Sequence, residues 1–389
     1  MVDDLFYPYE RKKLWTKEMI LLSLGNFLLY TSLYMYLPVL PLWIAGNFNC
    51  SYIESALIVS SFALAMFLPG PFNNYLIDAF KRKYIAFWAC IILGIVTLFY
   101  NQVTELWMVL AIRVIQGILF SIITTTISST LVIDVTPPKK RTDANISFSR
   151  LGKIGIIAGI VSGIYLYNYY SLSVILYLCL GISFLAAFLI LFIRVPFRAP
   201  LKPSFCSLDR FLLPRALPAA LNMLPIPIII GMNISSIGNE IFYLSIIIGA
   251  FIAFILLKHM LRSVSSKAEV EFSTAILISG LILLIFSVNN ISLAISAVLI
   301  GIGVSISSSR FYIIMISLPF HCERGSANNT YYLMWELGIF IGYITGFLFY
   351  NGDLVILYSI AVGIIILYIL VYELFTHKWY YKQMEKKQL

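Results

Sequence analysis

The chain contains one segment twice, first as RTDANISFSRLGKIGIIAGIVSGIYLYN at Arg141–Asn168 and again as RGSANNTYYLMWELGIFIGYITGFLFYN at Arg324–Asn351. Both copies begin with Arg-x-x-Ala-Asn, carry glycines at every fourth position in the middle and end in Tyr-Asn. All these matches share one offset (324 − 141 = 351 − 168 = 183), so nothing is inserted or deleted between them. The second half of the chain therefore repeats the first, and each copy runs from a polar turn into an apolar helix.

Apolar residues dominate the composition. Hydrophobic residues make up 60% of the 389 residues and the mean hydropathy is +0.92, which excludes an ordinary soluble globular protein. A helix needs roughly 20 apolar residues to cross about 30 Å of hydrocarbon. Twelve runs meet or approach this length: Met19–Ile44, Tyr52–Ile77, Tyr84–Tyr100, Glu105–Ile133, Ile146–Tyr167, Ser173–Ile193, Phe211–Met232, Ile237–Leu257, Phe272–Val288, Ser292–Leu318, Tyr331–Tyr350 and Leu354–Phe375. We therefore expect an all-α integral membrane protein with twelve transmembrane helices, the first of them uncleaved because it is too long for the core of a signal peptide.

Lysine and arginine are distributed unevenly across the predicted membrane. The net charge is +9, but apart from two arginines every basic residue lies at the chain ends or beside the loops that follow the even-numbered spans. This positive-inside pattern predicts a multi-pass protein of the cell (inner) membrane with both termini in the cytoplasm. The charge is typical of contact with anionic membrane lipids, and no nucleic-acid partner is expected.

The residue patterns that metal sites, disulfides and nucleotide binding require are not found. The five cysteines have no paired spacing, and the three histidines show no metal-ligand pattern. No glycine-rich phosphate loop is present, and a membrane-embedded enzyme would need clustered nucleophiles that the sequence lacks. We expect no disulfide, no metal, no cofactor and no enzymatic reaction.

A proline-rich stretch divides the chain. Residues 195–210 contain three prolines and several cations but no long apolar run. We expect a six-helix bundle over residues 1–194, a cytoplasmic linker over 195–210 and a second six-helix bundle over 211–389. Prolines also interrupt corresponding spans, as Leu-Pro-Val-Leu-Pro at 37–41 and Leu-Pro-Ile-Pro at 224–227. Such matched interruptions indicate either the transport pathway or tolerated kinks.

Two polar motifs resemble the major facilitator superfamily. Residues 74–83, NYLIDAFKRK, are similar to the loop signature Gly-x-x-x-Asp-Arg-x-Gly-Arg-Arg, with matches at Asp78, Arg82 and Lys83 and departures at 74, 79 and 81. Residues 113–117, RVIQG, resemble the family's Arg-x-x-Gln-Gly in the fourth helix. With the duplication and the twelve spans, the resemblance covers essentially the whole chain. It implies two pseudo-symmetric six-helix bundles that move a small organic solute by alternating access.

The glycines of the repeat resemble the family's antiporter signature only in part. Ile160 and Ser162 stand where that signature has proline and glycine. Small residues at every fourth position also let membrane helices pack closely. We favour this packing role for the two sets of glycines: Gly155, Gly159, Gly163, Gly338, Gly342 and Gly346.

Three of the charges inside predicted spans are candidate functional residues, because a charge at the middle of the bilayer costs about 2.5–3.5 kcal/mol. Arg113 and Arg310 are in helices that line the central cavity of the resembling family, so they are candidates for binding an anionic group, with structural ion pairs as the alternative. The resemblance suggests that Arg113 also biases the protonation of a nearby acid. Glu336, whose repeat counterpart is Lys153 (336 − 183 = 153), is the candidate proton-coupling site. The alternative for Glu336 is a structural pair with a cation.

The remaining candidates are polar residues at the cytoplasmic rim and along the cavity. By resemblance, Asp78 caps the eleventh helix and Arg82 pairs with Asp134, forming a switch that must break when the cavity opens inward. Uncharged side chains that suit an amphipathic substrate are Asn26, Tyr30, Tyr34, Gln116, Asn222 and Tyr312.

Together these features predict a monomeric, proton-coupled secondary transporter that exports a drug-like compound or metabolite. The alternatives are proton-coupled uptake of a nutrient or organic anion and, in another class, a non-transporting membrane sensor or a lipid translocator.

Overall fold

The computed structural model describes residues 13–195, 205–208, 211–261, 264–319, 323–350 and 352–388. Most of the expected linker over 195–210 and the final Asn351 of the repeat lie outside these ranges. The helices of the first half are α1 (Lys17–Met35), α2 (Leu40–Phe48), α3 (Tyr52–Ala65), α4 (Gly70–Ala79), α5 (Arg82–Leu98), α6 (Leu106–Thr126), α7 (Val132–Asp134), α8 (Arg141–Tyr169) and α9 (Leu172–Leu191). The helices of the second half are α10 (Leu217–Met223), α11 (Pro225–Ser236), α12 (Glu240–His259), α13 (Ser266–Ile285), α14 (Asn290–Ser317), α15 (Arg324–Phe349), α16 (Leu354–Val371) and α17 (His377–Gln388).

The number of membrane spans agrees with the sequence. Within the described ranges ten helical segments are long and apolar enough to cross a membrane, and two bent pairs bring the number to twelve. The pair α3 and α4 bends by 49° beside Pro69, and the chain bends by 47° where α11 begins at Pro225. Proline frees a backbone carbonyl and kinks a helix, so the predicted interruption of the seventh span is confirmed.

Two of the helix boundaries that differ from the predicted spans bear on the site, and they differ because apolarity alone marked the spans. The ninth span was expected from Phe272, yet α13 begins at Ser266, where the Ser265 side chain accepts a hydrogen bond from the backbone of Ala268. The eleventh span was expected from Tyr331 after a polar turn, yet α15 already begins at Arg324. Its polar first turns are helical because their side chains are buried against the other half of the chain.

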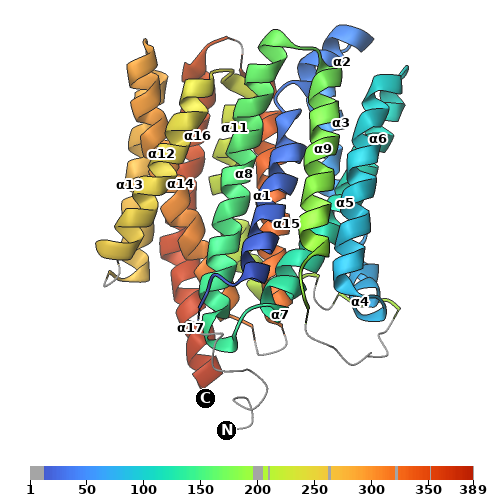
Figure 1. Cartoon of the computed structure of the whole chain (residues 1–389). Helices are drawn as coiled ribbons and strands as arrows, with labels where there is room; N and C mark the ends of the chain where they lie inside the picture. The colour runs from blue at the N-terminus through green and yellow to red at the C-terminus, as the bar shows by residue number, and fades with distance from the viewer. Residues whose placement is uncertain are drawn as a thin grey trace.

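The helices form a single layered bundle whose long members run side by side (Figure 1). Figure 1 shows that α1 begins and α17 ends at the same end of this bundle, where α4 and α7 also lie, whereas α2 lies at the opposite end. We refer to these as the termini end and the opposite end. In the first half α8 packs on α1, and in the second half α15 packs on α11 in the equivalent way.

Glycines permit these two close helix contacts. A Cβ atom on Gly159 would lie 2.6 Å from the carbonyl oxygen of Thr31 in α1. One on Gly342, its repeat counterpart, would overlap the carbonyl oxygen of Ile228 in α11. Real Cβ atoms avoid such distances, so both positions accept only glycine while the helices stay this close. The glycines therefore lie where the packing interpretation requires them.

Hydrogen bonds join the two halves at both ends. Near the termini end, Thr125 of α6 donates to the Asn329 side chain of α15 at 2.9 Å. The neighbouring Asn328 donates to the backbone carbonyl of Ser128 at 2.6 Å. Near the opposite end, the Tyr343 hydroxyl donates to the carbonyl oxygen of Leu37 at 2.8 Å. The space between the halves is thus bridged above and below.

Candidate functional site

A cavity of about 220 Å³ lies between the two halves, near the middle of the long helices. One wall is α8, and the other is formed by α12 and α14 with single residues of α11 and α15. Most of its lining is aliphatic or aromatic, including Ile154, Ile246 and Phe251. The charged members of the wall are Arg150 and Lys153, both on α8. An apolar space with a few polar groups at one side is typical of a site for an organic ligand.

Lys153 is a cation without an acidic partner in the described part of the chain. Its Nζ atom donates to the hydroxyl of Tyr331 at 2.6 Å and lies 4.1 Å from the centre of the Trp335 ring. Among the described residues, no carboxylate oxygen lies within 4.0 Å of it. Aromatic faces stabilise a buried ammonium group only in part, and two of its three protons remain available. The side chain is therefore poised to bind an anion.

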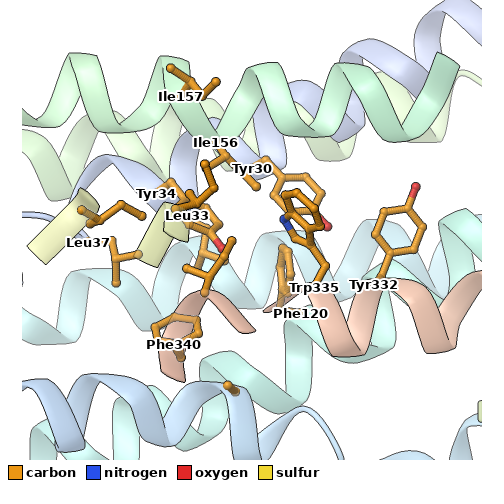
Figure 2. Close-up of a cluster of buried hydrophobic side chains, with 14 of the residues drawn as sticks. Tyr30, Leu33, Tyr34, Leu37, Phe120, Ile156, Ile157, Tyr332, Trp335 and Phe340 are labelled. Atoms are coloured by element: carbon orange, nitrogen blue, oxygen red, sulfur yellow. The ribbon is translucent and has the colours of Figure 1, made fainter. Parts of the chain in front are cut away.

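A second hydrogen-bond donor belongs to a residue that lines the same cavity. The indole N–H of Trp335 has no hydrogen-bond partner in the described part of the chain, although the residue is only 3% exposed. Trp335 and Lys153 line both the cavity and a smaller space beside it, which Tyr30 and Ile156 also border. Figure 2 shows Tyr30, Ile156 and Trp335 meeting between α1, α8 and α15. A buried donor without a partner calls for an explanation, and an acceptor on a ligand provides one.

Glu336 lies next in the chain but faces a different neighbour. It is fully buried, and its Oε2 atom accepts a hydrogen bond from the Tyr34 hydroxyl of α1 at 2.6 Å. Its Oε1 atom has no partner within the described residues, and the cation whose field acts on it is Arg113. The carboxyl group therefore bridges the two halves and keeps one oxygen free to carry a proton.

Arg113 is held inside a polar network of the first half. Its Nε atom donates to the carbonyl oxygen of Val59 at 2.9 Å, and its Nη1 atom donates to the side-chain oxygen of Gln116 at 3.1 Å. The guanidinium group also lies over the rings of Phe62 and Phe340, 4.5 and 5.6 Å from their centres. Arg113 and Gln116 do not line the cavity. Their position favours an effect on Glu336 over direct contact with a ligand in the cavity.

Arg310 has an acidic partner, Glu269, which lies outside the predicted ninth span. Its Nε atom donates to Glu269 of α13 at 2.6 Å, and its Nη1 atom donates to the Ser266 hydroxyl at 2.9 Å. The predicted ninth span begins only at Phe272, so it leaves Glu269 outside the membrane and away from Arg310. Arg310 faces α13 and does not line the cavity.

The uncharged candidates are dispersed. Tyr30 borders the smaller space, whereas the amide of Asn26 donates to the carbonyl oxygen of Phe148 at 3.2 Å and ties α1 to α8. Tyr312 donates to Asn328 within the second half. Asn222 is buried in α10, and its side-chain nitrogen has no partner among the residues described. Only Tyr30 of this group reaches the space beside Lys153.

Of the expected rim contacts, the ion pair of Arg82 with Asp134 is present in the first half, and the capping of the eleventh helix by Asp78 stays a prediction. Arg82 lies 2.5 Å from Asp134 and 3.6 Å from Asp78, at the termini end. The pairing of Arg82 with Asp134 is therefore confirmed as geometry, and its role as a switch stays a prediction. Part of the predicted linker is also placed, since Ser207 donates from its backbone to the carbonyl oxygen of Pro71 in α4 at 2.9 Å.

Lys153 is the residue whose importance the sequence argument missed. The positive-inside pattern groups it with the basic residues near a loop, although it lies seven residues after the start of the predicted span Ile146–Tyr167 (153 − 146 = 7). A lysine so far inside an apolar run was the signal that could have found it.

Comparison with known proteins agrees with this architecture. A profile of the Major Facilitator Superfamily matches residues 22–266. The chain belongs to the Major Facilitator Superfamily. It is therefore a membrane transporter and not an enzyme, and the family named from its motifs is confirmed.

Solved structures of the same fold cover nearly the whole chain. The human organic anion transporter MFSD10 is 14% identical with a TM-score of 0.68, and the match covers 94% of this chain and 100% of that one. A mutant of the nucleoside transporter NupG is 14% identical with a TM-score of 0.66, covering 91% and 98%. A bacterial homologue of the human lysosomal transporter Spinster, inward-facing and occupied, is 14% identical with a TM-score of 0.62, covering 94% and 96%. A search of curated protein sequences finds no match.

Proposed function

We propose that this secondary transporter carries amphipathic organic anions by alternating access. The observation that supports this most directly is Lys153, a cation without an acidic partner among the described residues, in the wall of an apolar cavity between the halves. A ligand with a negative group and an apolar body satisfies both features at once, because the charge meets Lys153 and the Trp335 N–H while the body removes apolar wall from water. That one structural neighbour is an organic anion transporter is consistent with this substrate class.

The moving parts in this proposal are the two bundles over residues 1–194 and 211–389, joined by the linker over 195–210. In this proposal the protein acts as a monomer in the cell (inner) membrane, and both termini lie in the cytoplasm, an orientation that the distribution of basic residues supports. The hydrogen bonds between halves near each end are then the contacts that break in turn as one end opens and the other closes.

We further propose that proton binding at Glu336 drives export. Its carboxyl group is fully buried, bridges the halves through Tyr34 and lies in the field of Arg113. Protonation removes a charge from the contact between halves and so changes the balance between the two conformations. We expect Glu336→Gln to abolish the dependence of transport on a pH gradient while ligand binding persists. Full proton-dependent transport by this variant would contradict the coupling role.

The substrate class is tested with purified protein in liposomes. The probes are a short radiolabelled arylcarboxylate, its uncharged amide and an arylamine of the same size. We expect transport of the carboxylate alone. Losing one charge-assisted contact costs about 1.5–3 kcal/mol, so Lys153→Met should weaken carboxylate binding roughly 10- to 150-fold, and Lys153→Arg should weaken it less.

Lys258→Met is the matched control, because Lys258 is exposed at the end of α12 and does not line the cavity. Carboxylate transport that is unchanged in Lys153→Met, or equal transport of the amide, would contradict the anion proposal. Assays in vesicles of both orientations separate export from uptake. Binding without any net flux would instead identify a sensor.

A further inference from the structure

The cavity is not closed on its side: it reaches the outer surface of the bundle between α8 and α12. Two of its lining residues on α12, Phe251 and Phe254, are 64% and 43% exposed. Ile154 of α8 and Ala250 of α12, one from each wall of the cavity, are half-buried. In a membrane this outer surface faces lipid, so the apolar cavity is continuous with the hydrocarbon.

The opening lies toward the termini end of the membrane. At the opposite end α8 and α12 are joined, since Asn168 donates to Glu240 at 3.2 Å. With a rise of about 1.5 Å per residue, Arg150 is about 14 Å and Lys153 about 18 Å along α8 from its start at the termini end. Both positions precede the midpoint of this 29-residue helix. The sideways opening therefore belongs to the membrane leaflet at the termini end.

A second cation stands at the edge of this opening. The guanidinium group of Arg150 lies over the ring of Phe254, 5.3 Å from its centre, and Arg150 is half-buried. One helical turn further along α8 comes Lys153, and Trp335, whose N–H has no partner among the described residues, lines the same cavity. Positive groups thus lead from the lipid-facing edge to the centre of the cavity, while the walls on either side are apolar. A purely hydrophilic anion gains no binding energy from the apolar walls, and a neutral lipid gains none from the cations.

We infer that the substrates are single-chain anionic amphiphiles taken from the leaflet at the termini end through the opening between α8 and α12. The inference rests on the proposed function and deepens it. The anionic head passes Arg150 and binds Lys153, and the chain stays in the opening, along Phe251 and Phe254. With cytoplasmic termini, this is the cytoplasmic leaflet, and release on the other side is export.

The test compares how chain length and a blocked opening affect inhibition. Butyl, octyl and dodecyl sulfate, below solubilising concentrations, compete with transport of the short arylcarboxylate probe in proteoliposomes. Ala250→Trp places a large side chain in the opening. Ile248→Trp is its control, because Ile248 lies on the same helix, is 55% exposed and does not line the cavity.

We expect Ala250→Trp to weaken inhibition by dodecyl sulfate at least about fivefold more than inhibition by butyl sulfate, as for an overfilled apolar site. Ile248→Trp should change neither. Because each inhibitor is compared between variants, its partitioning into the bilayer cancels. An equal effect of Ala250→Trp on all three chain lengths would overturn the lateral route.

A second experiment tests from which leaflet the amphiphile enters. Vesicles are sorted by whether the C-terminal helix lies inside or outside, and dodecyl sulfate is added to one side of the membrane. Inhibition should require addition on the side of the termini, and equal inhibition from both sides would overturn the leaflet assignment. Failure of the proposed function gives a different result, namely carboxylate transport that does not depend on Lys153. If transport depends on Lys153 but not on chain length or the opening, the anion transporter stands and the lateral route falls.

Discussion

Replacing Gly159 by alanine tests whether the recurring glycines of α8 serve helix packing. The added Cβ atom would lie 2.6 Å from the carbonyl oxygen of Thr31 and 3.1 Å from backbone atoms of Tyr34 and Met35. Ordinary contact begins at 3.4 Å, so α1 and α8 must separate by 0.8 Å (3.4 − 2.6). The obstacle is helix backbone and not a flexible side chain, so the strain is not relieved by a rotamer change. Overfilling of this kind costs about 1–3 kcal/mol.

Gly181→Ala is the matched control for this substitution. Gly181 lies in α9 and a Cβ atom there would have nothing within 4 Å. Both variants gain the same helix propensity, about 1 kcal/mol from glycine to alanine, so their difference isolates the packing cost. In thermal unfolding of the purified proteins, followed by tryptophan fluorescence, Gly159→Ala should melt below Gly181→Ala by about 2–4 °C for each kcal/mol in a bundle of this size.

Equal melting of the two variants would refute the packing argument. A Gly159→Ala protein that is as stable as its control but has lost the coupling of transport to protons would instead favour the antiporter interpretation of these glycines. The same comparison applies to Gly342, which the 183-residue offset places against α11 in the second half.

Two further predictions concern the contacts around the site. Tyr34→Phe removes the hydrogen bond between α1 and Glu336. A hydrogen bond contributes about 0.5–1.5 kcal/mol net, so this change should lower kcat roughly two- to tenfold with little change in KM. A large rise in KM would place Tyr34 in contact with substrate. Arg82→Gln and Asp134→Asn should each lower turnover, and the double variant should be no worse than the more damaging single one, because the two side chains form one ion pair. Additive losses in transport rate would show that Arg82 acts through another group, with Asp78 the nearest candidate.

The fold was largely predictable because a membrane imposes strong rules on sequence. A backbone in hydrocarbon must form helices of a certain length, so the apolar runs counted the spans correctly. The repeat at Arg141 and Arg324 revealed the duplication, and its glycines indicated close helix contacts before their partners were known. Helix ends were less accurate, because the polar first turns of α13 and α15 are helical without being apolar.

The site was harder to predict, since it depends on which neighbour each side chain faces. Arg310 was a cavity candidate until the true start of α13 placed Glu269 beside it. Arg113 turns toward Val59 and Gln116 inside the first half, although nothing in its sequence surroundings distinguishes that direction from the cavity. Lys153 looks in the sequence like one more basic residue near a loop and like the counterpart of Glu336, and neither feature predicts that it faces a cavity.

By itself, then, the sequence determined the number of spans, their duplication and the positions where helices could approach each other. The number of spans follows from the cost of transferring each residue into the membrane, and the close approaches follow from residue size. Both are local properties that a sequence shows directly. The tertiary structure alone decided that Lys153 faces a cavity while its counterpart Glu336 bonds to Tyr34. That difference arises because Lys153 and Glu336 belong to different halves and each faces the other half. The partner of a side chain across such an interface is set by the packing of helices far apart in the chain.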